Sequence, residues 1–167
     1  MTTPLQPSGS AGDAIKSLRT LFVWAMLGYV ALTLFFQFFD WLLPNNDTFA
    51  SRSYFADFAD LYTIVLPLLA VLLATVVQPA LGIGKLAALA ALGLYAFTLF
   101  FDGITFLIGL GYAFDRVDTA SEVLGAFGHI VFGLFDLVWV ALAGFAVFKI
   151  FTAIGGKLNV GSAAPAA

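Results

Sequence analysis

The amino-acid sequence predicts an all-α integral membrane protein: an antiparallel bundle of four transmembrane helices with left-handed packing. Of its 167 residues, 62% are hydrophobic and only 10% are charged, whereas soluble domains carry roughly 25% charged residues. The hydrophobic residues form four long stretches, each long enough to cross a hydrocarbon layer about 30 Å thick. Since so few charges could not cover a soluble fold, we expect the lipid bilayer to surround a single membrane domain, residues 1–167.

The N-terminal part of the chain predicts a tail followed by the first transmembrane helix. Residues 1–12 are rich in Pro, Ser, Gly and Thr, which is typical of a disordered segment. Residues 18–43 are almost entirely apolar, with Trp24 and Trp41 near their two ends, where membrane proteins place interfacial aromatic residues. Pro44 and the polar residues after it are expected to end this helix.

Three further apolar stretches predict the remaining transmembrane helices. Residues 60–81 form the second and contain Pro67, which a membrane helix tolerates with a kink. A short turn leads to the third, residues 86–112, so these two helices should form an antiparallel hairpin. The fourth covers residues 122–148, and the small, polar residues 155–167 predict a disordered C-terminal tail.

Charged residues are distributed unequally between the two ends of the predicted bundle. Basic residues favour the cytoplasmic side of a membrane, so we expect both termini in the cytoplasm and the protein in the plasma membrane. One end would hold Lys16, Arg19, Lys85, Lys149 and Lys157, and the other Arg52 and Arg116. The second end also collects acidic residues, namely Asp40, Asp47, Asp57, Asp60, Asp115, Asp118 and Glu122.

Small and polar residues recur at heptad spacing along residues 86–112. In a membrane helix such a stripe should face the inside of the bundle, packed left-handed at about 20°. Asp102 lies in its middle, and an ionisable residue at membrane depth is a functional-site hypothesis by default. The stripe consists of Ala88, Ala91, Tyr95, Thr98, Asp102, Thr105, Gly109 and Tyr112.

The other three stretches carry comparable stripes, and rough depths from the basic end place their polar residues near Asp102. The stripes are Met26, Val30, Thr33, Gln37 and Asp40; Asp60, Thr63, Pro67, Ala70 and Ala74; and Gly125, His129, Phe132 or Gly133, Asp136, Val140 and Ala143. We therefore predict an intramembrane polar cluster of Gln37, Thr98, Asp102, Thr105, His129 and Asp136.

The cluster contains two carboxyl groups and a single possible cation. No Lys or Arg lies in the predicted membrane interior, so we predict a contact between Asp102 and His129. We also expect at least one of Asp102 and Asp136 to be protonated or to bind a cation. Two interpretations stay open: the polar residues fix the helix register through hydrogen bonds, or they form a path for protons or cations.

Several function classes find no support in the sequence. Without cysteine there is no thiolate chemistry, and a single histidine allows no bis-histidine haem. There is no basic patch for nucleic acid and no nucleophile beside a base, so we expect no enzyme, no cofactor and no metal site. Our first expectation is a small non-catalytic accessory or scaffold subunit that contacts lipid and other membrane proteins, or further copies of itself. The alternative is a small proton- or cation-coupled transporter or channel.

Overall fold

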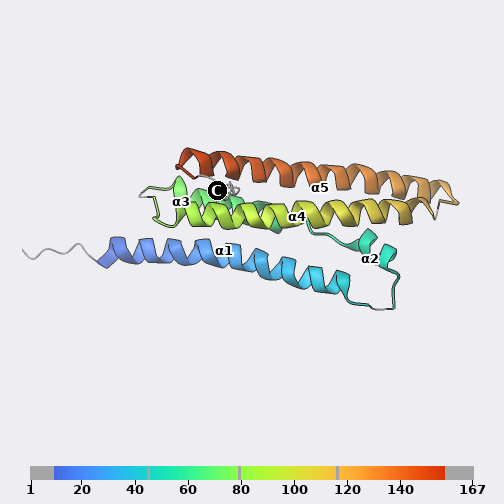
Figure 1. The fold of residues 1–167 in the computed structure, drawn as a ribbon, viewed down its shortest axis with the longest axis horizontal. Helices are drawn as coiled ribbons and strands as arrows, with labels where there is room; N and C mark the ends of the chain where they lie inside the picture. The colour runs from blue at the N-terminus through green and yellow to red at the C-terminus, as the bar shows by residue number, and fades with distance from the viewer. Residues whose placement is uncertain (1–9, 45, 79, 116, 157–167) are drawn as a thin grey trace, which may run out of the picture.

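The computed structural model describes residues 10–44, 46–78, 80–115 and 117–156. Within these ranges the fold is all-helical, without strands, and three of the helices are long and apolar enough to cross a membrane: Ala14–Leu42 within α1, α4 and α5. Figure 1 shows these three running along the long axis of the molecule. The described residues form five helices: α1 (Ser10–Leu42), α2 (Phe49–Phe55), α3 (Leu61–Thr75), α4 (Gly84–Phe114) and α5 (Ala120–Ala153).

The two ends of the molecule differ, and we name them by their content. The termini end holds the start of α1, the α3–α4 turn and the end of α5, whereas the acidic end holds α2 and the α4–α5 loop (Figure 1). Residues 10–12, predicted to belong to a disordered tail, form the first turn of α1 instead. The rest of that tail and residues 157–167 lie outside the described residues.

Helix α1 packs through a face different from the predicted one. Its buried residues are branched or aromatic and belong to a neighbouring stripe: Val23, Leu27, Val30, Leu34 and Trp41. Of the predicted face only Val30 is buried, while Gln37 is partly buried and Asp40 is exposed. The bulky aliphatic side chains bury more apolar surface against α3 and α4 than the polar stripe could.

The predicted second transmembrane helix, residues 60–81, is shorter than expected. Helix α3 has 15 residues, or about 22 Å at 1.5 Å per residue, less than the roughly 30 Å of a hydrocarbon layer. Its start is fixed by Asp60, whose carboxylate accepts a hydrogen bond from the Thr63 backbone N–H at 2.6 Å. Residues 56–60, which we call the break, separate α3 from α2, a helix of seven residues. The chain therefore returns from the acidic end in two helical pieces.

The termini end is tightly packed by small residues of α3 and α4. Ala70, Ala74, Ala87, Ala88 and Ala91 are completely buried, which lets the two backbones approach closely. The Tyr95 hydroxyl donates to the Ile64 carbonyl at 2.5 Å. At the rim, Arg19 donates to the carbonyls of Leu73 and Val77, both at 2.7 Å, near the C-terminus of α3.

The heptad stripe of α4 faces the interior as predicted. Every member from Ala88 to Gly109 is buried, and Tyr112 is partly buried. The stripe of α5 is confirmed only near the termini end, where Val140 and Ala143 are buried. Closer to the acidic end the stripe is packed less tightly, since Gly125 is exposed and His129 only partly buried. The core is therefore dense at one end and hollow at the other.

This packing predicts that a larger residue at Ala91 destabilises the fold. Ala91→Leu should lower the free energy of unfolding by about 1–3 kcal/mol, because the extra carbons have no space between α3 and α4. Ala96→Leu, on the exposed face of the same helix, is the matched control and should change little. Unfolding in detergent, followed by circular dichroism, compares them; equal stabilities would contradict the tight helix contact.

Candidate functional site

The break lies against the middle of α4 and is held there by side chains from three helices. Phe58 is almost fully buried, and its carbonyl accepts a hydrogen bond from the Thr63 hydroxyl at 3.0 Å. Gln37 of α1 donates to the Asp57 carbonyl at 2.9 Å. The Phe58 ring packs against that of Phe101 of α4, at 6.0 Å between ring centres. Buried non-helical backbone needs hydrogen-bond partners from the protein, and Gln37 and Thr63 supply two of them.

A cavity of about 230 Å³, which we call the inner cavity, opens between the break, α4 and α5. It brings together carboxylates from all three: Asp57 of the break, Asp102 of α4 and Asp136 of α5. Thr105 and His129, two further members of the predicted cluster, also line it. The sequence-predicted polar residues of α4 and α5 thus share one cavity, with the exception of Thr98.

Asp102 lies deepest, with a side chain that is only 7% exposed. The negative charges of Asp57 and Asp136 are both close enough to act on it. Asp57 is exposed at the rim of the inner cavity. Three like charges therefore repel one another around a small volume, which favours uptake of a proton or cation.

His129 does not form the predicted contact with Asp102. No hydrogen bond or ion pair joins these two described residues, and the imidazole Nε2 is buried without a hydrogen-bond partner. The ring instead stacks between Tyr54, at 4.6 Å between ring centres, and Phe106, at 5.6 Å. It lies on Gly109, two helical turns beyond Asp102 toward the acidic end, so the direct contact is not formed.

The other predicted cluster residues lie around the inner cavity or outside it. Gln37 lines a separate cavity of about 320 Å³ on the far side of the break, together with Asp40 and Arg52. The Thr98 hydroxyl is buried one turn from Asp102 and has no hydrogen-bond partner. The Thr105 hydroxyl donates to the carbonyl of Phe101 in its own helix at 3.0 Å.

Sequence reasoning missed Asp57 and Tyr54 as site residues. Both precede the stretch predicted as the second transmembrane helix, so they were placed in an acidic loop. One signal was available, because Asp57 and Asp60 repeat in the sequence Phe-Ala-Asp-Phe-Ala-Asp, and Asp60 is a good helix N-cap. An N-cap at Asp60 implies that the preceding residues are not helical.

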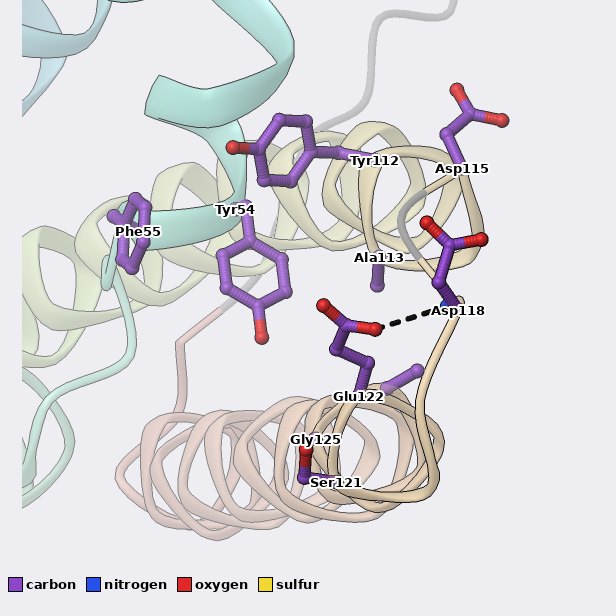
Figure 2. Close-up of a pocket in the computed structure, with 10 residues that line it drawn as sticks. Tyr54, Phe55, Tyr112, Ala113, Asp115, Asp118, Ser121, Glu122 and Gly125 are labelled. Atoms are coloured by element: carbon purple, nitrogen blue, oxygen red, sulfur yellow. Dashed lines mark hydrogen bonds between the residues drawn. The ribbon is translucent and has the colours of Figure 1, made fainter.

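A larger cavity of about 670 Å³, the outer cavity, lies nearer the acidic end between α2, α4 and α5. Figure 2 shows Tyr54 projecting from α2 toward α5, with Tyr112 of α4 beside it. The Glu122 carboxylate is fixed at the cavity wall, because it accepts hydrogen bonds from the backbone N–H of Asp118 at 3.0 Å and of Thr119 at 2.8 Å. An acidic, aromatic cavity therefore lies outside the inner one.

Among the described residues, no group of three or more His, Cys, Asp or Glu side chains is close enough to hold a metal ion. Comparisons with protein-family models, curated proteins and solved structures found no match to this chain. The function is therefore argued from the geometry of the cavity.

The shared cavity predicts a pH-dependent gain of stability in Asp57→Asn. Above the ordinary carboxyl pKa of about 4, the negative charges of Asp57, Asp102 and Asp136 repel one another, and the amide removes one of them. The variant should therefore have a higher unfolding midpoint than the wild type at pH 7, and the difference should shrink in acid, where carboxyl groups are protonated. Asp115→Asn, at an exposed position, serves as control. A gain that grows with acidity would contradict the assignment.

Proposed function

We propose that this protein is a small proton- or cation-coupled membrane transporter or channel, with the inner cavity as its binding site. The observation that supports the proposal is the convergence of Asp57, Asp102 and Asp136 on one cavity where the returning chain is not helical. Ionisable residues at membrane depth are costly and are generally retained for ion or proton pathways. Breaks in membrane helices also place backbone groups beside bound ions, which agrees with this arrangement.

The proposal includes a membrane arrangement of four crossings in an antiparallel, left-handed bundle. In this arrangement α1, α4 and α5 each cross the membrane once, and α2, the break and α3 together form the second crossing. The greater number of basic residues near the termini supports a cytoplasmic position for that end. We propose the plasma membrane as the location.

In that orientation the two halves of the molecule would play different roles. The inner and outer cavities would open toward the outside, and the acidic loops there would concentrate cations. The packed alanines around Tyr95 would close the cytoplasmic half. Such a molecule takes up a proton or cation from outside at Asp102 and must rearrange near Tyr95 to release it inward.

Flux through the purified protein tests the proposal. In proteoliposomes with an imposed potassium diffusion potential, a pH-sensitive dye inside should report faster proton entry than in empty liposomes. Asp102→Asn should reduce this entry to the empty-liposome rate, because the amide cannot carry a proton, while Asp115→Asn should retain it. Corresponding sodium and potassium fluxes are measured with ion-sensitive dyes.

Two results would reject the proposed function. One is a wild-type protein no more permeable to protons, sodium or potassium than empty liposomes. The other is full flux in Asp102→Asn. Reaction of Asp102 with dicyclohexylcarbodiimide, read by mass spectrometry, gives an independent measure, since this reagent modifies protonated carboxyls in apolar surroundings.

A non-catalytic accessory subunit is the second candidate, and a groove between α1 and α4 favours it. The groove holds about 400 Å³ and is apolar, with Phe35, Phe38 and Phe97 among its walls and Gly93 at its base. We propose another transmembrane helix, from a partner or a second copy of this chain, as its occupant. A Cβ on Gly93 would meet no atom within 4 Å, so Gly93→Phe should fill the groove without disturbing the fold.

Native mass spectrometry in mild detergent tests this second candidate. The wild type should carry a stoichiometric partner or a second copy, and Gly93→Phe should lose it at unchanged thermal stability. Gly111→Phe, at an exposed glycine of the same helix with equally open surroundings, is the matched control. Association that survives Gly93→Phe would reject the groove as the interface.

A further inference from the structure

The inner and outer cavities meet at a single side chain. Within the described part of the chain, Tyr54 is the one residue that lines both. The outer cavity, which is nearly three times as large as the inner one, lies on the side of Tyr54 that faces the acidic end. The three carboxylates lie on the opposite side of Tyr54, in the inner cavity. Any species that moves from the acidic end to Asp102 by this route must therefore pass the Tyr54 ring.

Tyr54 belongs to a stack of three rings from three different elements. Its ring lies 4.6 Å from that of His129 at an interplanar angle of 28°, and Phe106 lies on the other side of His129 at 5.6 Å and 23°. Because the rings come from α2, α5 and α4, the stack bridges the gap between these helices. Figure 2 shows the Tyr54 ring extending across this gap toward α5.

A glycine allows the stack to close. A Cβ on Gly109 would lie 2.9 Å from the Tyr54 Cα and 3.0 Å from the His129 Nε2, both too close for a normal contact. Only a residue without a side chain lets α2 and the imidazole approach α4 at this height. The His129 Nε2 there has no hydrogen-bond partner, so the stack contains one polar atom that is available to a passing proton donor or acceptor.

We propose that the stack of Tyr54 and His129 is a gate that controls access from the outer cavity to the carboxylates of the inner cavity. The gate opens when the Tyr54 ring leaves His129. Helix α2 is the element suited to this movement, because it has only seven residues and non-helical chain on both sides. The inference rests on the proposed function only in naming protons or cations as the species that pass.

Cysteine accessibility tests the gate without any measurement of transport. The chain has no cysteine, so single cysteines can be introduced at Gly128, which lines the inner cavity, and at Gly125, which lines the outer one. Both lie on α5 about one turn apart, and a Cβ at either would meet no atom within 4 Å. The probe is a membrane-impermeant, positively charged methanethiosulfonate added from the acidic side of proteoliposomes.

The gate predicts different rates for the two cysteines. With Tyr54 present, Gly128→Cys should react about tenfold more slowly than Gly125→Cys, the factor expected for a strong aromatic pair. Tyr54→Ala should remove this difference, and Tyr54→Phe, which keeps the ring, should preserve it. Gly109→Ala gives a second way to displace α2 and should also speed the reaction of Gly128→Cys.

Equal rates for the two cysteines with Tyr54 intact would overturn the proposal, as would a slow Gly128→Cys that neither Tyr54→Ala nor Gly109→Ala accelerates. An unchanged Gly125→Cys rate in each background shows that the variants are folded. Failure of the gate and failure of the proposed function are distinguishable. A gated inner cysteine in a protein without ion flux rejects only transport, while ion flux with equal cysteine rates rejects only the gate.

Discussion

The structure depends on the contacts that hold the break against α1, α3 and α4. Buried backbone groups need hydrogen-bond partners, so a non-helical stretch inside the molecule survives only if the protein supplies them. Here α1 contributes Gln37 and α3 contributes Thr63 as hydrogen-bond donors, and α4 contributes Phe101, whose ring packs against Phe58. Because three helices converge on five residues of chain, the break couples the register of all three.

The break also explains why the two ends of the molecule differ. Helix α3 begins at Leu61, directly after its N-cap Asp60, so toward the acidic end it can cover α4 only as far as the region of Tyr95 and Thr98. Up to this level, alanines pack against α3; beyond it, Asp102, Thr105 and Gly109 face the break and α2 instead. A seven-residue helix fills less volume than a full crossing would, and the cavities occupy the difference.

The predictable part of the fold follows from periodicity. The α4 stripe was predicted correctly because its small and polar residues contrast with Leu and Phe at every turn. In α1 the contrast is weaker, since Val23 and Leu27 border the more polar stripe of Met26 and Thr33, so the wrong face was chosen. The end of α3 at Thr75 was not predicted, because the residues that follow it up to 81 stay mostly apolar and hydropathy does not show where the helix stops.

The site was predicted in part for a related physical reason. Heptad spacing placed Asp102, Asp136 and His129 on inward faces, and all three line the inner cavity. The number of residues from the basic end gives the depth of a side chain along its own helix. It does not show which side chains of neighbouring helices are in contact. The stacking of His129 with Tyr54 and Phe106 depends on α2, a helix that the hydropathy pattern did not reveal.

The unpaired polar atoms favour a binding role over a purely structural one. Residues that only fix helix register should satisfy one another, since buried polar groups are paired in the great majority of cases. Here Gln37 Oε1, Thr98 Oγ1 and His129 Nε2 are buried without a partner. His129 lines the inner cavity and Thr98 lies one turn from Asp102, whereas Gln37 lines the separate cavity beyond the break. The carboxylates of the inner cavity repel one another, an arrangement that costs stability. A site that takes up a proton or cation relieves this repulsion, so the polar residues are better explained by binding than by packing.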